Sequence, residues 1–303
     1  MAATERIRRQ FNRREVLAGV LFALPAILGI LIFQLGPLVV SLGLSLTDYD
    51  ILTKTNIVWF ENYKRLAQDP LVLKSAINTL YVTALGVPLQ LLTALSLALL
   101  LNAETKAMAF FRTVYYLPAI TPTVAAAILW RWILQSQWGL LNSALGLVGI
   151  QGPLWLGSEH WSKPSIVLMS LWGQGGSMLI FLAGLKGIPR QLYEAAEIDG
   201  ASRWYRFTRI TLPMLSPTIF FLMVLSIIGN LKVFTESYVL TQGGPLNSTL
   251  FYVYNLFNNA FVYFRMGYAS ALAWVFFILV LILTLAQFRL ADRWVYYEVG
   301  GAE

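Results

Sequence analysis

Charged side chains gather in the segment 187–215, where their spacing could support binding to another protein. Glu194 and Glu197 are three residues apart and share one face of a helix, and Arg203 and Arg206 share a face of a second helix. Carboxylates on an exposed helix can pair with arginines of a partner. A solvated amphipathic helix that rests on lipid headgroups is the alternative interpretation of the same pattern.

Residue types that support enzymatic chemistry are scarce. The chain has no Cys and one His, His160, so thiolate sites are excluded and a metal centre of the usual His and Cys ligands is not expected. The phosphate-binding pattern G-x-x-x-x-G-K-[ST] does not occur. We therefore expect no catalytic residue, no metal and no cofactor in this chain. An intramembrane enzyme would need a catalytic constellation within the apolar segments and is weakly supported.

The composition indicates lipid as the main solvent. Of 303 residues, 57% are hydrophobic and 12% are charged, whereas about a quarter of the residues of soluble domains are charged. The aromatic share of 14% excludes a disordered chain. The distribution of the net charge of +7 favours a membrane surface over nucleic acid as the partner.

Long stretches without charged residues define the membrane segments. A helix needs about 20 mostly apolar residues to cross the hydrocarbon core. Such stretches predict six transmembrane helices at about 17–43, 75–101, 111–135, 165–186, 216–239 and 267–289. Two other uncharged stretches, 132–158 and 237–264, contain clusters of Gly and Pro that favour loops or interfacial segments. The predicted fold class is an all-α polytopic membrane protein.

The predicted domain organisation is a single transmembrane domain over residues 1–303. It comprises a cytoplasmic N-terminus 1–16, a six-helix core 17–289 and a cytoplasmic C-terminus 290–303. This orientation places most of the 22 Lys and Arg residues on the cytoplasmic side, as the positive-inside rule requires. The charged segment 187–215 is then cytoplasmic, and the protein is multi-pass with both termini in the cytoplasm.

Residues 250–264 predict a short amphipathic helix. Their aromatic residues recur every three or four positions, which places on one helical face Phe251, Tyr254, Phe257, Phe261 and Phe264. We interpret the segment as a helix lying at the outer surface of the membrane. A core helix within an outer loop is the alternative.

The segment 187–215 predicts two short helices with a glycine elbow, lying across the membrane face. Gly200 interrupts a run of good helix formers. Pro213 is predicted to end the loop, and Ser216-Pro217 is typical of the N-cap and first-turn proline of the next span.

The fixed residues of this loop are similar to those of a known family. Glu194-Ala195-Ala196 is followed by three residues, Gly200, nine residues and Ile210-Thr211-Leu212-Pro213. This pattern resembles the EAA loop of ATP-binding-cassette (ABC) importer permeases at each fixed position, and Asp199 resembles the sugar-importer version. The likeness extends to Thr241-Gln242-Gly243-Gly244-Pro245 after the fifth span.

The resemblance implies a type I ABC importer permease (MetI-like) fold and a mechanism. It implies a heterodimer with a second permease subunit, two ATPase subunits that carry ATP and Mg²⁺, and an extracytoplasmic solute-binding protein that delivers a carbohydrate. It also implies a non-enzymatic subunit of the cytoplasmic (inner) membrane of a prokaryote, related to maltose, lactose and glycerol-phosphate permeases. No nucleic acid takes part.

The same resemblance implies roles for the loop residues. Glu194 would pair with a basic residue of the ATPase, and Ala195 and Ala196 would permit close approach. Gly200 would make the turn between the coupling helices. The predicted coupling set is completed by Asp199, Leu212 and Pro213.

Polar residues within the predicted spans could meet a sugar. Lys232 and Glu236 lie four residues apart on one face of the fifth span, where an internal ion pair is the alternative to a pore-lining role. Asn230 is nearby, and Trp172 and Gln174 lie in the middle of the fourth span. Sugar sites combine an aromatic platform with amide and charged groups, so these five residues form the predicted substrate pathway. The partner permease holding most of the site is the alternative.

A stand-alone secondary transporter or channel for a small polar solute is the competing hypothesis. It would predict repeated halves and discontinuous helices. No convincing internal repeat is visible in the sequence.

Overall fold

The computed structural model describes residues 13–50 and 55–296, and the regular structure of this part is helical apart from one isolated bridge between Thr47 and Ile57. The α-helices are α1 Arg13–Ile30, α2 Gly36–Ser45, α3 Glu61–Gln68, α4 Pro70–Leu100, α5 Lys106–Ile120, α6 Thr123–Ile133, α7 Leu140–Leu147, α8 Ser162–Trp172, α9 Gly175–Gly187, α10 Arg190–Ile198, α11 Arg203–Arg206, α12 Leu212–Leu231, α13 Thr235–Leu240, α14 Tyr252–Phe257 and α15 Met266–Ala291. Three π-helical turns are η1 Leu31–Leu35, η2 Phe207–Thr211 and η3 Asn258–Val262. The predicted all-α fold class is confirmed. Of the predicted cytoplasmic termini, residues 1–12 and 297–303 lie outside the described residues.

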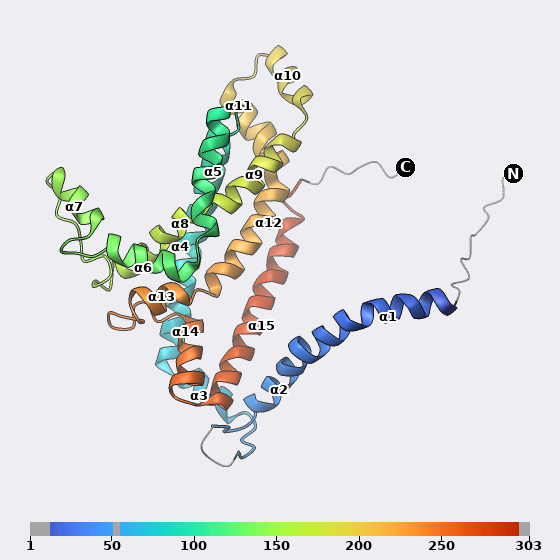
Figure 1. Ribbon diagram of the computed structural model, residues 1–303, viewed down its shortest axis with the longest axis vertical. Coiled ribbons are helices and arrows are strands. Elements are labelled where there is room, and N and C mark those ends of the chain that lie inside the picture. The colour runs from blue at the N-terminus through green and yellow to red at the C-terminus, as the bar shows by residue number, and fades with distance from the viewer. Residues whose placement is uncertain (1–12, 51–54, 297–303) are drawn as a thin grey trace.

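The described residues contain up to six segments that could cross a membrane. Four continuous stretches are long and apolar enough, namely Leu17–Ser45, Pro70–Leu100, Arg203–Leu231 and Met266–Ala291. Two more arise when α5 with α6, and α8 with α9, are each taken as one bent span. Counted in this way, the segments correspond to the six predicted spans. In the bundle, α4, α12 and α15 run side by side (Figure 1).

The third predicted span, 111–135, is not one continuous helix. α5 begins earlier than predicted, at Lys106, and the chain turns by 99° between α5 and α6. Pro122 has no backbone N–H and disfavours a helical conformation of the residue before it. Thr121 is accordingly extended, with ψ 130°. The proline therefore ends α5, and α6 leaves the bundle sideways (Figure 1).

The fourth predicted span bends by 51° between α8 and α9, at Gly173 and Gln174. The fifth predicted span, 216–239, is wrong at both ends. α12 already begins at Leu212 and ends at Leu231, and the next helix starts at Thr235. Lys232 therefore lies at the break after α12, and Glu236 lies on a different helix, α13.

Pro213 does not end the loop, because α11, η2 and α12 form one continuous stretch from Arg203 to Leu231. Pro213 lies in the first turn of α12, where a missing backbone N–H costs little. Pro217 lies inside α12 and therefore does not begin a helix after Ser216. The second loop helix is thus directly continuous with the span.

A closely packed core joins α4, α9 and α12. Ala94 and Ala98 of α4 are fully buried in one cluster with Phe181 of α9. A Cβ on Gly184 of α9 would lie only 2.8 Å from Oγ1 of Thr218 on α12. Small residues allow membrane helices to approach in this way. This core packs α9 and α12, the helices on either side of the loop 187–215, against α4.

Within 250–264, the helical residues are those of α14 and η3, which form a core helix, so the prediction of a helix at the membrane surface is wrong. α14 packs against α4 and α15, and the backbone N–H of Tyr252 donates to Thr79 Oγ1 at 2.9 Å. Asn255 and Asn259 are buried, whereas Phe261 is exposed. The π-helical turn η3 inserts an extra residue per turn and rotates the later aromatic residues away from the face that the spacing predicted.

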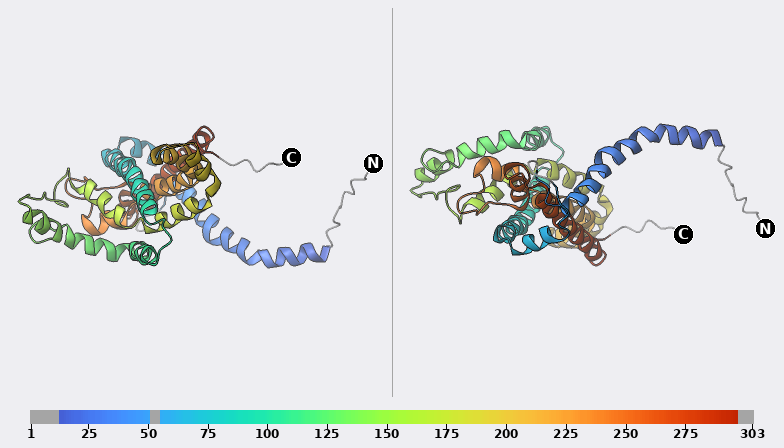
Figure 2. Two further views of the ribbon diagram at one scale, coloured as in Figure 1. Left: turned by 90° about the horizontal axis from the view of Figure 1, so that it is seen from above. Right: turned by 90° about the horizontal axis from the view of Figure 1, so that it is seen from below.

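α1 stands apart from the bundle. It projects away from the other helices in both end views (Figure 2), and 0% of the most apolar window of Leu17–Ser45 is buried. α2 returns to the bundle and packs against α15, where Trp274 Nε1 donates to Ser41 Oγ at 3.2 Å. The apolar surface of α1 therefore faces lipid or another membrane subunit.

Candidate functional site: a coupling loop and a polar cavity

The glycine elbow of the loop 187–215 is present. Gly200 adopts a left-handed conformation with φ +73°, which a residue with a Cβ adopts only at a cost. Its N–H donates to the Glu197 carbonyl at 3.0 Å, and the N–H of Ala201 donates to the Ala196 carbonyl at 2.8 Å. These bonds close the end of α10 at Asp199 and turn the chain toward α11.

Two side-chain contacts hold the helices of the loop together. Glu197 pairs with Arg206 at 3.2 Å and joins α10 to α11. The Tyr193 hydroxyl hydrogen-bonds the Thr211 hydroxyl at 2.9 Å and joins α10 to η2. Glu194 is exposed, and no acid–base partner lies beside it among the described residues. Its carboxylate is free to bind another protein.

The loop also exposes apolar side chains at the end of the molecule. Ile198 is 87% exposed and Trp204 is 72% exposed. Ala195 is exposed and Ala196 half-buried on the same short helix, where small side chains allow close approach. α10 and α11 form one extreme of the long axis (Figure 1). An apolar patch rimmed by charges in this position is typical of a protein-binding surface.

The two remaining predicted coupling residues lie where the loop joins the span. Leu212 and Pro213 are half-buried in the first turn of α12. They do not belong to the exposed patch. They lie within the continuous helical stretch that joins α11 to α12.

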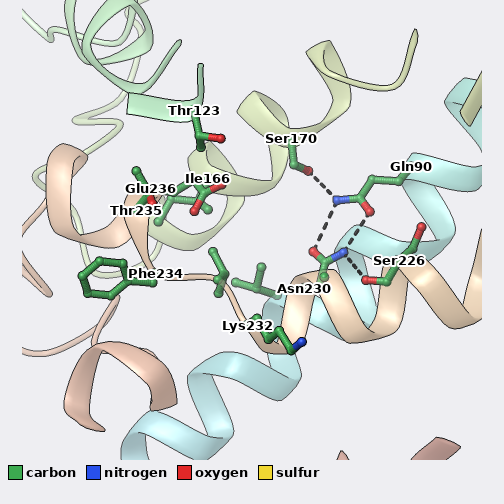
Figure 3. A pocket seen from close by; sticks show the side chains of 13 residues that line it. Gln90, Thr123, Ile166, Ser170, Ser226, Asn230, Lys232, Phe234, Thr235 and Glu236 are labelled. Atoms are coloured by element: carbon green, nitrogen blue, oxygen red, sulfur yellow. Dashed lines mark hydrogen bonds between the residues drawn. The ribbon is translucent and has the colours of Figure 1, made fainter. Parts of the chain in front are cut away.

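A cavity of about 380 Å³ lies at the other end of α12. Its walls come from α4, α6, α8, α12 and the segment 232–236 (Figure 3). The polar lining residues are Gln90, Thr123, Ser170, Ser226, Asn230, Lys232, Thr235 and Glu236, and the apolar ones are Val82, Ile166, Val233 and Phe234. Hydrogen-bonding groups and an aromatic ring therefore share one cavity.

A network of amide hydrogen bonds crosses this cavity. Asn230 Nδ2 donates to Gln90 Oε1 at 2.8 Å, and Gln90 Nε2 donates to Ser170 Oγ at 2.8 Å (Figure 3). The network joins α12, α4 and α8. It requires close approach at Gly86, where a Cβ would lie 2.9 Å from Asn230 Oδ1. The amides are therefore fixed in orientation at the cavity wall.

Lys232 and Glu236 line the cavity but do not share a helix face. α12 ends before Lys232, and Glu236 lies in the first turn of α13. No ion pair joins these two side chains in the described part of the chain, so the alternative of an internal ion pair is not supported. Both charged groups, and the Phe234 ring between them in sequence, face the same space.

Trp172 and Gln174 lie outside the cavity lining. Trp172 packs edge-on against Trp130 with ring centroids 6.3 Å apart, and Gln174 Nε2 donates to the Ser170 carbonyl at 2.8 Å. The structure thus brings together three of the five predicted pathway residues. Gln90 was missed, although an amide within a long apolar stretch is the same signal that singled out Asn230.

Nothing in the described part of the chain gathers three or more His, Cys, Asp or Glu side chains that could hold a metal ion. The arrangement supports hydrogen bonding to a polar solute and docking to a protein. It offers no nucleophile with a neighbouring base.

An all-helical bundle with several membrane-length helices, a polar cavity between them and a protruding charged loop defines a polytopic membrane permease. Residues 86–296 match the family described as "Binding-protein-dependent transport system inner membrane component", and the chain belongs to this family. The match confirms the resemblance to ABC importer permeases that the loop sequence predicted.

Known proteins cover nearly the whole chain. It is 44% identical to "Probable ABC transporter permease protein YesP" of Bacillus subtilis, over 94% of both chains. It is 37% identical to "Lactose transport system permease protein LacF" of Rhizobium radiobacter, over 96% of this chain and 99% of that protein. In structure it is similar to a chain of a bacterial alginate ABC transporter solved with an alginate pentasaccharide-bound periplasmic protein. The TM-score is 0.82, with 25% identity over 93% of this chain and 96% of the other.

Proposed function

We propose that this chain is a permease subunit that moves a carbohydrate across the cytoplasmic membrane and is driven by separate ATPase subunits. The continuous helix Arg203–Leu231 carries this proposal. It begins in the exposed loop just after Gly200, and Ser226 and Asn230 near its far end line the cavity. A movement imposed on the loop therefore reaches the cavity wall through one element.

The loop residues supply the contact with the ATPase. Glu194 offers an unpaired carboxylate to a basic side chain of the ATPase. Ile198 and Trp204 supply apolar contact area beside it. Gly200 fixes the angle between the two loop helices. ATP and Mg²⁺ belong to the ATPase subunits, and this chain acts only as their membrane partner.

The cavity supplies part of the substrate pathway. A sugar has hydroxyl edges and apolar ring faces. Gln90 and Asn230 present amide groups to the hydroxyls, and Lys232 and Glu236 add a cation and an anion without excess charge of either sign. Phe234 offers a ring for an apolar sugar face. The named substrates of several relatives, such as lactose and arabinooligosaccharides, support this substrate class.

The remaining subunits complete the path. α1 projects from the bundle with its apolar surface uncovered, which supports contact with a second permease subunit in a heterodimer. A solute-binding protein delivers the substrate from the outside, as the periplasmic protein in the alginate transporter complex supports. The excess of Lys and Arg on the loop side supports a cytoplasmic position for the loop and for both termini.

Affinity purification from native membranes tests the coupling role. A tagged full-length chain is purified in mild detergent, and the eluate is assayed for ATP hydrolysis and for co-purified subunits. Glu194→Ala is expected to retain about a tenth or less of the co-purified ATPase, because one charge-assisted contact contributes about 1.5–3 kcal/mol. The matched control is Glu61→Ala, an exposed carboxylate of α3 whose pairing with Lys64 is solvent-exposed.

Proteoliposome uptake with the purified complex then tests the substrate class. We expect uptake of a labelled neutral oligosaccharide that requires ATP and is reduced by Asn230→Ala. ATP-independent uptake by the chain alone, or equal ATPase recovery with Glu194→Ala and wild type, would contradict the proposal and favour a stand-alone transporter.

A further inference from the structure

A second cavity lies beside the coupling loop, at the ends of α4 and α9. Its volume is about 320 Å³, and its polar lining comes from Asn102, Glu104, Lys186, Arg190 and Tyr193. The lining combines the loop between α4 and α5, the last turn of α9 and the first turn of α10. It is separate from the transport cavity, which none of these residues lines.

Cations outnumber anions in this cavity. Lys186 Nζ lies 3.0 Å from Glu104 Oε1. Arg190 is exposed, and no carboxylate pairs with it in the part of the chain that the structure describes. Arg112 lies close by and donates to the Leu101 carbonyl at 2.7 Å. Three cations therefore surround one carboxylate.

The carboxylate of Glu104 stays ionised in this setting. The hydrogen bond from Lys186, and then the positive charges of Lys186, Arg190 and Arg112, hold the pKa of Glu104 below its ordinary value. Glu104 therefore neutralises one of the three cations, and a net positive potential is left for an anion.

The cavity lies where two apolar helices, α4 and α5, are joined. α4 ends at Leu100, which is 72% exposed, and α5 resumes with Lys106 and carries Phe110, which is 66% exposed. Exposed apolar side chains thus flank the loop that lines the cavity. Such side chains at the ends of membrane helices contact acyl chains, while basic residues next to them meet headgroup phosphates.

We propose that this cavity binds the headgroup phosphate of an anionic phospholipid of the cytoplasmic leaflet, held by Lys186 and Arg190. Basic pockets between helix ends on the cytoplasmic side suit this ligand. An acidic surface of the ATPase fits less well, because the exposed apolar residue Ile198 lies at the opposite end of α10 from Arg190. The bound lipid would steady the first turn of α10, and thus the base of the coupling loop.

Native mass spectrometry of the purified full-length chain tests this site. The protein is titrated with dioleoylphosphatidylglycerol and, separately, with dioleoylphosphatidylcholine. We expect wild type to retain the anionic lipid in preference to the zwitterionic one. The double variant Lys186→Gln/Arg190→Gln is expected to bind phosphatidylglycerol about 25-fold more weakly, at about fivefold for each charge removed.

Matched variants separate the site from general charge and from folding. Arg209→Gln/Arg289→Gln removes the same charge outside the cavity and is expected to bind like wild type. The conservative variant Lys186→Arg/Arg190→Lys keeps both cations in the cavity and should retain the lipid. Equal loss in both charge-removing double variants, or lipid loss in the conservative variant, would overturn the proposal.

Two further arms identify the source of the anion. Displacement of the lipid by millimolar inorganic phosphate would assign the cavity to a free anion. Unchanged lipid retention together with loss of ATPase binding in Lys186→Gln/Arg190→Gln would assign it to a protein contact. Either result would contradict the proposed lipid site and would leave the proposed transport role of the other cavity unaffected.

Discussion

Two loops at opposite ends of the bundle are held in contrasting ways. In the outer loop 241–250, Thr249 Oγ1 donates to the Gly244 carbonyl at 2.9 Å and hydrogen-bonds Thr241 at 2.6 Å, and Asn78 of α4 donates to the carbonyls of Asn247 and Leu250. The coupling loop 187–215 depends on one ion pair and one hydroxyl pair.

The difference shows which loop is complete by itself. The outer loop is held by hydrogen bonds within the loop and from Asn78 of the bundle, and its Thr249 is fully buried. The coupling loop leaves Glu194 unpaired and Ile198 uncovered. A surface with unsatisfied binding capacity gains order from a partner, so the outer loop should respond to mutation in stability and the coupling loop in partner binding.

The largest effect is expected for Asn78→Ala. Asn78 is 3% exposed, and its side chain donates to the carbonyls of Asn247 and Leu250. Its loss removes the donor to the Leu250 carbonyl and one of two donors to the Asn247 carbonyl, which keeps the Leu250 N–H at 3.3 Å. The free energy of unfolding should fall by about 2–3 kcal/mol, measured by denaturation of the detergent-solubilised chain. The exposed Asn102 provides the control in Asn102→Ala. Equal destabilisation by Asn78→Ala and Asn102→Ala would show that the contacts of the outer loop add no special stability.

Gly200→Ala should act in the opposite sense, on binding and not on stability. A left-handed alanine costs about 1–2 kcal/mol, and the loop can relieve this by leaving its docked shape. We expect about tenfold weaker binding to purified ATPase subunits with an unchanged melting temperature. The control is Gly187→Ala in the same loop, where a Cβ meets open space. A large drop in the melting temperature of Gly200→Ala would contradict the prediction that this loop affects partner binding and not stability.

Gly86→Ala tests the region between the two loops. The new Cβ would displace Asn230 from Gln90, at a cost of about 1 kcal/mol in hydrogen bonding. Sugar uptake should decrease while ATPase binding stays the same. Gly229→Ala, at the same cavity but in open space, is the matched control. Unchanged sugar uptake in Gly86→Ala would show that the amide network takes no part in the substrate pathway.

The smallest effect is expected for Glu197→Gln. Its ion pair with Arg206 spans 3.2 Å, with the Glu197 side chain 71% exposed and the Arg206 side chain 19% exposed. Because solvent screens the exposed carboxylate, the pair should contribute less than about 1 kcal/mol, and thermal unfolding should change little. Glu61→Gln, which breaks the exposed pair with Lys64, should match it. A clearly larger loss of thermal stability in Glu197→Gln than in Glu61→Gln would show that the coupling loop is stabilised by its own contacts.

Much of the fold follows from apolar stretch length, but the breaks do not. Pro88 and Pro217 lie inside continuous helices, whereas Pro122 ends α5. A proline within a span is compatible with either outcome, because neighbouring helices can satisfy the freed backbone groups. The bend at Pro122 depends on packing that no local pattern encodes.

The candidate sites also differ in whether local sequence or tertiary structure determines them. The elbow at Gly200 is a local feature, so the spacing of its loop predicts it correctly. The cavity needs Gln90, Ser170 and Asn230 from three separate helices. Single-residue polarity identified Asn230, but only the tertiary arrangement excludes Trp172 and Gln174 and includes Gln90.

The unbroken helix Arg203–Leu231 has a mechanical consequence. Its 29 residues form a rod of about 43 Å at about 1.5 Å per residue. A tilt of about 10° about the loop end sweeps the cavity end through about 7 Å, which exceeds one helical turn of about 5.4 Å. A small rotation at the loop end of this helix would therefore be amplified into a displacement large enough to separate Asn230 from Gln90.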